Sequence, residues 1–368
     1  MKHVVTIDAR TFGATGLGRY VDDLLENFAS IDHEFRFRVL CRNPKEMPGF
    51  SAEKFEFIRA TSPIYSLKEQ WEIACLARGG DLLHCPHYNI PYFYRGRLVV
   101  TIHDLTHLTH REFLPNHLAG FYARFMLKAA ALHADQIITV SEFSKRSICE
   151  SLNIPGEKVH VIHNALSERF RCARPADSSC LQKFRIRKPY LLFVGLLKPH
   201  KNVQGLLRAF AVLPAQLRDS HQLVIIGKLD SYYPALRKIV EELSLEKDVL
   251  FTGQVSDEEL GALYAGAKVF VLPSLSEGFG FPVLEAMACG IPVIASDNSA
   301  LPEVVGDAGI LVDPKDYLSI ARGIEAMLTD AALREKFSLI GKQRAQLFSR
   351  REFALRHLEV YRQVFYGH

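Results

Sequence analysis

The sequence contains no apolar run near the ~20 residues that a helix needs to cross a bilayer, and Asp8 and Arg10 interrupt the stretch where a signal peptide would be apolar. Its seven cysteines are scattered without a CxxC pair, which is typical of reduced, buried thiols. The 45 basic and 41 acidic side chains leave a formal charge of +4, well short of a dedicated nucleic-acid binder. We therefore expect a cytoplasmic protein that binds an anionic small molecule or membrane surface and no nucleic acid.

The length and composition predict two folded domains. The chain has 368 residues and 48% apolar content, and one domain usually takes roughly 100–200 residues. The first half alternates short apolar segments with segments of helical periodicity, which indicates a parallel α/β sheet covered on both faces. Strands are expected at 3–8, 35–41, 54–60, 81–86, 97–104, 136–141 and 159–164, and helices at 18–29, 66–78, 116–133 and 142–152.

The second half restarts the same alternation. Residues 165–188 lose periodicity and are rich in Arg, Ser and Pro, so we place the junction there, between a domain at 1–168 and one at 185–345. A closing helix at 346–368 could continue the second domain or cross back to the first. Strands are expected at 189–195, 221–227, 248–253, 268–274 and 291–296, and helices at 203–213, 233–243 and 257–267. Because ligands of such sheets bind at the carboxyl ends of the strands, we expect a cleft between the domains.

One loop of the second half, SEGFGFPVLEAMACG, carries two carboxylates around a sharp bend. Gly278 and Gly280 permit backbone conformations and close ligand approach that a side chain forbids. A helix is expected to begin at Pro282, with Glu285 in its first turn and with N–H groups suited to phosphate. Gly290 is expected to end this short helix.

The two carboxylates of this loop predict a site for a nucleotide sugar. Ionised carboxylates only accept hydrogen bonds, and each takes two donors, so Glu277 and Glu285 suit the vicinal hydroxyls of a sugar or ribose. The alternative is a solvated loop glutamate followed by a glutamate that stabilises the helix dipole.

Six further motifs extend over nearly the whole chain. They are GATGLGRYVDDLL, VVTIHDLTHL, ITVSEFSKRSI, VIHNA, FVGLLKPHKN and TGQVSDEELGALYAGAKVFVLPS. In this order, and together with the glutamate loop, the series resembles the retaining glycosyltransferases of family 4. The resemblance implies the GT-B architecture, an α/β fold of two doubly wound Rossmann-like domains facing a central cleft. It also implies a nucleotide diphosphate sugar as co-substrate, with no metal and no other cofactor.

The resemblance assigns roles to residues of the second half. Glu277 matches the glutamate that contacts the donor hexose, and Glu285 matches the one that binds ribose hydroxyls. Phe279 and Gly280 lie in the loop whose backbone reaches the sugar and the diphosphate. Lys201 matches a lysine that neutralises the diphosphate; by residue type alone, a solvated loop lysine is the alternative.

One position departs from the family pattern. Many members carry an arginine directly after the glycine at Gly195, and here Leu196 follows it, which removes a bidentate phosphate clamp. Lys198 is the candidate substitute for that arginine as a phosphate ligand. It stands at a different spacing, and it supplies a point charge in place of the planar guanidinium. We rank it below Lys201.

In the first half the resemblance points to the glycine-rich turn after the first strand. Gly16 and Gly18 match positions that bring the backbone near the donor phosphate or the acceptor. A Rossmann dinucleotide fingerprint is the alternative, but its third glycine is missing near Val21, and no acidic residue for the ribose ends the second strand.

His103 follows the strand RLVVTI and matches the histidine that contacts the donor sugar near the reaction centre. By residue type alone, a structural histidine is the alternative. His103, His107 and His110 together suggest a set of metal ligands. Only His107 and His110 could share a helical face, so we expect no metal site.

We therefore expect a retaining glycosyltransferase that moves a hexose, best mannose from GDP-mannose, to a hydroxyl of a glycan or lipid-linked glycan in polysaccharide biosynthesis. Glu277, His103 and Lys201 are the expected catalytic residues. Segment 111–133 mixes aromatic and basic residues, as a helix at the surface of the inner membrane would, although ordinary packing is the alternative. The rival functions are a sugar-nucleotide epimerase or phosphorylase of the same architecture, or a nucleotide-sugar-binding partner without catalysis.

Overall fold

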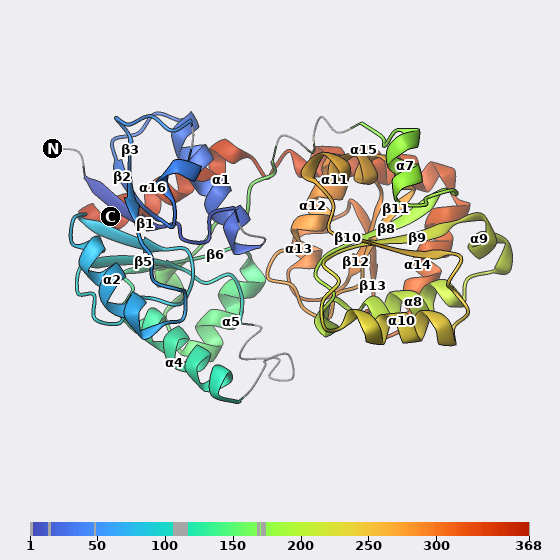
Figure 1. The fold of residues 1–368 in the computed structure, drawn as a ribbon, viewed down its shortest axis with the longest axis horizontal. Helices are drawn as coiled ribbons and strands as arrows, with labels where there is room; N and C mark the ends of the chain where they lie inside the picture. Colours follow the sequence, from blue (N-terminus) through green and yellow to red (C-terminus); the bar gives the residue numbers. More distant parts are fainter. Residues whose placement is uncertain are drawn as a thin grey trace. The chain divides into compact units, whose positions relative to one another are not determined.

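The computed structural model describes residues 3–13, 16–47, 49–105, 117–167, 170 and 174–367. The chain divides into two compact units (Figure 1). The first comprises Met1–Ala165 together with Ser349–His368, and the second comprises Leu166–Phe348. The last segment of the chain therefore belongs to the first unit.

The first unit is built on a seven-stranded parallel sheet in the order β3-β2-β1-β4-β5-β6-β7. Its strands are β1 Val4–Asp8, β2 Arg36–Cys41, β3 Phe55–Arg59, β4 Leu82–Cys85, β5 Arg97–Thr101, β6 Gln136–Thr139 and β7 Val159–Val161. Its helices are α1 Leu17–Ser30, α2 Leu67–Ala77, α4 His117–His133, α5 Glu142–Leu152 and α16 Arg350–Tyr366. Apolar residues of α2, α4 and α5 share one core with one face of the sheet, and α1 packs with α16 on the other.

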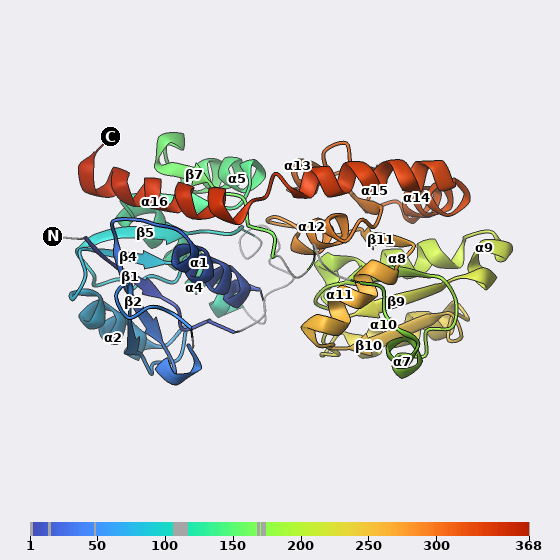
Figure 2. The same cartoon turned by 90° about the horizontal axis from the view of Figure 1, so that it is seen from above.

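The second unit holds a six-stranded parallel sheet in the order β10-β9-β8-β11-β12-β13. Its strands are β8 Tyr190–Val194, β9 Gln222–Ile226, β10 Val249–Gly253, β11 Val269–Leu272, β12 Val293–Ser296 and β13 Gly309–Val312. Its helices are α7 Ser178–Lys183, α8 Val203–Ala211, α9 Ala215–Ser220, α10 Tyr233–Glu242, α11 Asp257–Gly266, α12 Phe281–Ala288, α13 Leu301–Val305, α14 Tyr317–Thr329 and α15 Ala331–Ala345. Helix α8 packs with α10 and α14, whereas α12 packs with α11, α13 and α15 (Figure 2).

The expected doubly wound α/β fold is confirmed, and all the strands expected from the sequence form. The central strands are buried along almost their whole length, as they are when helices cover both faces. In each sheet the chain first builds strands to one side and then returns to build to the other. The order reverses between β1 and β4 in the first unit and between β8 and β11 in the second. Loops leaving such a pair of strands diverge, which opens a crevice at their carboxyl ends.

A buried chain of hydrogen bonds attaches α16 to the first sheet. Tyr361 Oη lies 2.7 Å from His84 Nδ1, and His84 Nε2 lies 2.9 Å from Thr101 Oγ1. Thr101 Oγ1 lies 3.0 Å from Tyr20 Oη, which lies 2.7 Å from His357 Nε2. Through these bonds, two side chains of α16 meet β4, β5 and α1.

The direction of donation in this chain follows from its last member. His357 Nδ1 lies 2.7 Å from the Phe353 carbonyl oxygen, which only accepts, so Nδ1 carries the proton and Nε2 accepts from Tyr20. Donation then runs one way from Tyr361 to His357, and both imidazoles are neutral. Burial lowers the pKa of His357 to about 4 and holds that of His84 well below its ordinary value, which agrees with this assignment.

The His357→Gln substitution should make the stability of the first unit less dependent on pH. Unfolded histidine binds a proton near pH ~6.5, whereas folded His357 does so only near pH 4, so acidification between those values favours unfolding. The stability difference between the wild type and His357→Gln should shrink by about 2 kcal/mol between about pH 7 and about pH 5. Urea unfolding at the two pH values measures it.

Tyr20→Phe is the matched control, because it removes the bond to His357 but keeps the titrating group. Its stability difference from the wild type should change much less with pH. A difference for His357→Gln that stays constant with pH would contradict the assignment of a neutral, buried imidazole.

Candidate functional site

In the second unit, two loops leave the point where the strand order reverses, and hydrogen bonds hold them together. The loop after β8 ends in the short 3₁₀ helix Pro199–Lys201, and the loop after β11 leads to α12. The Leu275 N–H donates to the His200 carbonyl oxygen at 2.7 Å. Buried Asn202, in the left-handed region at φ 54°, donates through Nδ2 to the carbonyl oxygens of Pro273 and Pro314.

Lys201 and Glu277, which lie 76 residues apart in the sequence, form an ion pair at this point. Lys201 Nζ lies 2.7 Å from each carboxylate oxygen of Glu277, and Ser274 Oγ donates to Glu277 Oε1 at 2.8 Å. The side chains are only 16% and 10% exposed. The pair is therefore largely shielded from water, where its attraction is stronger than that of a surface pair.

The backbone of Glu277 is fixed by the loop after β12. Its N–H donates to Ser299 Oγ at 3.1 Å, and its carbonyl oxygen accepts from the Ala300 N–H at 3.3 Å. Loops from three neighbouring strands thus hold one carboxylate in place. An ammonium and a carboxylate held this way can bind an anionic group and a set of hydroxyls side by side.

Helix α12 begins at Phe281, one residue before the expected start, so Pro282 is its second residue. Glu285 is then its fifth residue, and the expectation that it lies in the first turn is wrong. No side chain caps the helix at Gly280. Its second residue is a proline without an N–H, and the N–H groups of Val283 and Leu284 donate to the Gly280 carbonyl oxygen at 3.0 and 3.4 Å. This N-terminus therefore offers an anion chiefly the positive end of the helix dipole. Gly290, at φ 76°, follows the end of the helix as expected.

Two candidate side chains of this region are engaged inside the unit. Glu285 is 2% exposed, and its Oε2 accepts from Tyr264 Oη on α11 at 3.0 Å. The buried ring of Phe279 packs edge-on against Phe281 and Phe348. Only the backbone of Phe279 suits a ligand contact, as expected, and the roles of both residues remain predictions.

Lys198 does not join Lys201 and Glu277. Its Nζ lies 2.8 Å from Asp230 Oδ2, in the loop after β9, and this hydrogen bond is the main reason that the pKa of Asp230 is lowered. Leu196 is 46% exposed on the same loop as Lys198. Lys198 would have to leave Asp230 to serve as the phosphate ligand that the missing arginine supplies in other members.

The candidates of the first half lie in the first unit. Gly16, at φ 71°, precedes α1, and Gly18 lies within the first turn of that helix. His103 follows the end of β5 by two residues, and its Nε2 donates to the Pro86 carbonyl oxygen at 3.0 Å. Its ring meets Tyr20 edge-on, with 4.7 Å between the centroids, and burial lowers the pKa of His103. The imidazole is therefore neutral at pH 7.

The histidines that suggest a metal set are His103, His107 and His110. His107 and His110 lie outside the described residues. Within the part of the chain that the structure describes, no three His, Cys, Asp or Glu side chains are grouped so as to hold a metal ion.

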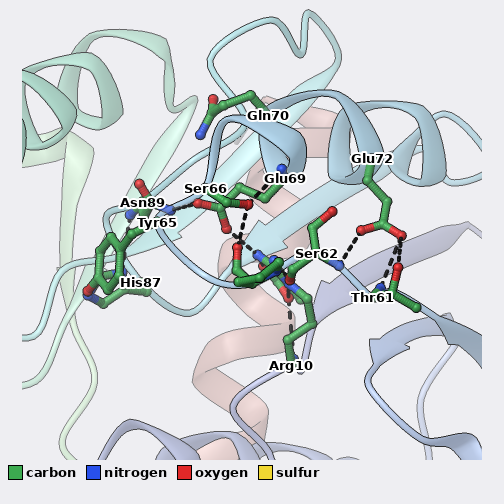
Figure 3. Close-up of polar contacts among 12 residues, drawn as sticks. Arg10, Thr61, Ser62, Tyr65, Ser66, Glu69, Gln70, Glu72, His87 and Asn89 are labelled. Carbon is green, nitrogen blue, oxygen red and sulfur yellow. Dashed lines mark hydrogen bonds and ion pairs between the residues drawn. The ribbon is translucent and has the colours of Figure 1, made fainter.

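A second polar cluster, not expected from the sequence, lies where the strand order of the first unit reverses (Figure 3). Arg10, two residues after β1, donates to both oxygens of Asp8 at 2.8 and 2.7 Å, to Glu69 Oε2 at 2.9 Å and to the Ser62 carbonyl oxygen at 3.0 Å. Asn89, after β4, donates to Glu69. The arginine after the first strand was visible in the sequence, but nothing there indicated that Glu69 and Asn89 would meet it.

Comparison with solved structures identifies the fold. Sucrose-phosphate synthase from Thermosynechococcus elongatus superposes with a TM-score of 0.80 at 22% identity and covers 100% of both chains. Anabaena HepE in complex with UDP-glucose gives a TM-score of 0.76 at 20% identity over 98% of this chain and 99% of that one. The fold is thus of the GT-B type.

Sequence comparison identifies the family. Residues 182–344 match glycosyl transferases group 1, and residues 14–169 match glycosyltransferase family 4. The chain is 35% identical to O-antigen chain mannosyltransferase B of Escherichia coli over 95% of its length and 96% of that protein. It is 33% identical to O-antigen chain mannosyltransferase RfbU of Salmonella typhimurium over 70% of its length and 68% of that protein. The chain belongs to glycosyltransferase family 4, as the motifs indicated, and is a glycosyltransferase.

Gly280→Ala should destabilise the second unit. Gly280 has φ 109°, which disfavours a side chain, and an added Cβ would lie 2.6 Å from Leu301 Cδ2. We expect a loss of about 1–3 kcal/mol in the free energy of unfolding, measured by urea titration. Gly156→Ala is the control, because its nearest neighbour would lie at 3.9 Å, and it should cost much less. Equal stabilities of the two variants would contradict the prediction.

Proposed function

We propose that this enzyme transfers mannose from GDP-mannose to a hydroxyl of a glycan or lipid-linked glycan in O-antigen biosynthesis, with retention at the anomeric carbon. The observation that carries the proposal is the shielded Lys201–Glu277 pair at the strand-order reversal of the second unit. The relatives named as O-antigen mannosyltransferases support the sugar and the pathway. The enzyme would work at the cytoplasmic side of the inner membrane.

The residues of the second unit suit the donor. Lys201 would neutralise charge on the diphosphate, together with the positive end of the α12 dipole. Glu277 would accept hydrogen bonds from hydroxyls of the hexose. Glu285 would bind the ribose after a rotation away from Tyr264, and Gly280 would let the backbone approach the sugar.

Glu277 would orient the sugar and would not act as the nucleophile. Each of its oxygens lies 2.7 Å from Lys201 Nζ, and Oε1 also accepts from Ser274, so three of its four lone-pair sites are occupied and its charge is partly neutralised. Oε2 keeps one site for a sugar hydroxyl. The acceptor oxygen would attack from the face that the diphosphate leaves. The new C–O bond forms as the bond to the diphosphate breaks, and a diphosphate oxygen takes the acceptor proton.

In the first unit, the neutral imidazole of His103 would contact the donor sugar near the reaction centre. Its Nε2 proton is directed to Pro86, so the protonated nitrogen positions the ring and Nδ1 remains an acceptor. Gly16 and the first turn of α1, including Gly18, would bring backbone near the phosphate or the acceptor.

The rival functions give different products. A phosphorylase would consume inorganic phosphate, and an epimerase would turn over GDP-mannose without releasing GDP. A binding partner without catalysis, which the exposed Leu196 in place of the usual arginine would favour, would bind the donor and release nothing. Thermal shifts with GDP-, UDP-, ADP- and dTDP-sugars name the base, because a ligand of the native state stabilises it.

Lys201→Ala should lower kcat/KM for GDP release by about 10²–10³, because the charge that forms on the leaving diphosphate loses its main cation. Glu277→Gln should lower it by a similar factor, since hydroxyl donors then meet an amide. Lys198→Ala should have a smaller effect, because Asp230 already neutralises this lysine. Acceptor-dependent release of GDP measures all three.

The control for this series is Lys238→Ala on α10, an exposed lysine that pairs with Glu242 of its own helix. It should leave turnover unchanged. If Lys201→Ala and Glu277→Gln both turn over at the rate of the wild type, the donor site lies elsewhere.

We also propose that α4 rests on an anionic membrane surface, which would bring the enzyme to a lipid-linked acceptor. Phe121, Phe125 and Leu132 form a stripe on its exposed side, and Arg124 and Lys128 are exposed among them. No helix among the described residues is long and apolar enough to cross a membrane.

Phe121→Ser with Phe125→Ser should weaken binding to vesicles of phosphatidylglycerol and phosphatidylethanolamine by about tenfold, because the apolar stripe loses its largest groups. Co-sedimentation at low and high salt measures it. Leu318→Ser with Leu339→Ser, two exposed positions of the second unit, is the matched control and should change nothing. Equal binding of the two double variants would contradict docking through α4.

A further inference from the structure

The strand-order reversal of the first unit holds a pocket of about 120 Å³. Its walls come from the segments after β1 and β4 and from the loop before α2. Its lining includes Asp8, Arg10, Tyr65, Pro86, His87 and Asn89. Pro86 also accepts the hydrogen bond from His103, so the pocket adjoins the histidine expected near the reaction centre.

Among the lining residues that the structure describes, Arg10 is the only lysine or arginine, and it cannot serve as an anion clamp. Four of its five side-chain N–H bonds are used, two on Asp8, one on Glu69 and one on the Ser62 carbonyl. Its side chain is 3% exposed. Two carboxylates thus face one guanidinium, and the lining offers acceptors without a spare positive charge.

The remaining polar groups of the pocket are fixed in orientation. The Asn89 N–H donates to His87 Nδ1 at 3.2 Å, so His87 is neutral and carries its proton on Nε2, which donates to Tyr65 Oη at 3.2 Å. Asn89 Oδ1 accepts from Tyr122 and its Nδ2 donates to Glu69, which leaves one Nδ2 hydrogen for a ligand. Asp8 Oδ2 accepts one bond from Arg10 and has a second lone pair.

Tyr65 at the rim of the pocket has an unusual backbone. Its φ is 65°, in the left-handed region that a bulky aromatic residue rarely adopts, and its side chain stays half exposed. Tyr122 meets its ring edge-on and His87 bonds its hydroxyl. The surroundings therefore hold a strained residue whose half-exposed aromatic side chain lines the pocket, and such strain is concentrated at ligand sites.

We propose that this pocket binds the acceptor through one uncharged sugar ring, and that it rejects sugars carrying phosphate or another anionic group. The ring would lie on Tyr65, and its hydroxyls would donate to Asp8 and accept from Asn89. The carboxylates would repel an anion that Arg10 is not free to bind. This assignment rests on the proposed function, because it names the acceptor of that reaction.

Saturation-transfer NMR with the whole protein tests the assignment, with methyl α-mannopyranoside and mannose 6-phosphate as probes. Tyr65→Gly removes the ring and relieves the backbone strain, and Tyr65→Asn serves as a second variant because asparagine tolerates this φ. Asn153→Gly is the matched control, because it places a glycine at another exposed residue of the first unit whose backbone is in the left-handed region.

The neutral sugar should give a signal with the wild type and with Asn153→Gly that falls at least about fivefold in both Tyr65 variants. The mannose 6-phosphate signal should be nearly the same in the wild type and in the Tyr65 variants, so that the part that depends on Tyr65 is near zero. This part should rise in Glu69→Gln, because that substitution removes one carboxylate charge. A neutral-sugar signal that is the same in the wild type and the Tyr65 variants, or absent from all, overturns the proposal. So does a Tyr65-dependent phosphate-sugar signal as strong as the neutral one.

Failure of the proposed function would look different. Acceptor-dependent GDP release would then be absent from the wild type, whatever the sugar-binding result. If only the pocket assignment is wrong, Tyr65→Gly turns over GDP-mannose with an unchanged KM for the acceptor.

Discussion

The reversal of strand order in each parallel sheet is the constraint on which both candidate sites depend. Buried parallel strands need helices on both faces, so the chain must at some point return past its first strand and build outward on the other side. The loops at that point run to opposite faces and leave their backbone and side chains exposed to a ligand. Lys201 and Glu277 follow β8 and β11, and Arg10 and Asn89 follow β1 and β4. Each set spans a reversal point.

Much of the fold could be predicted from the sequence, because strands and helices depend largely on local patterns of apolar residues. Parallel strands buried on both faces appear as short apolar runs. Helix α5 was predicted at its observed bounds, where the structure places a serine cap before it and an asparagine in the left-handed region at its end. Glu277 and Lys201 were selected through the family resemblance of their motifs, and their roles remain predictions. Strand β13 was not predicted, since this edge strand is only partly buried and its apolar run is short.

What could not be predicted depends on contacts between distant segments. The pairing of Lys201 with Glu277 joins residues 76 positions apart, and no pattern in either segment requires it. Nothing in the sequence singled out Tyr65, because a left-handed φ at an aromatic residue is imposed by its surroundings. The start of α12 was misplaced by one residue because a proline fits either of the first two helical positions when its own N–H is not needed.

The two reversal points differ in the freedom of their cations. Lys201 directs two of its three N–H bonds at one carboxylate, and an ammonium on a flexible stem can turn to a phosphate oxygen while keeping part of that contact. Arg10 is a planar group with all three nitrogens bonded, so moving it would break several bonds inside a buried cluster. A charged donor therefore suits the second unit and a neutral acceptor the first.

The hydrogen-bonded chain through α16 adds a constraint on how the first unit forms. Tyr20, His84 and Thr101 are buried polar groups, and their partners His357 and Tyr361 are synthesised after the second unit. Before α16 docks, these groups must remain hydrated, because burying them unpaired costs about 1–3 kcal/mol each. The first sheet thus reaches its final packing only after the second unit has been made. Since Tyr20 also packs against His103, the same step completes the surroundings of a residue expected at the reaction centre.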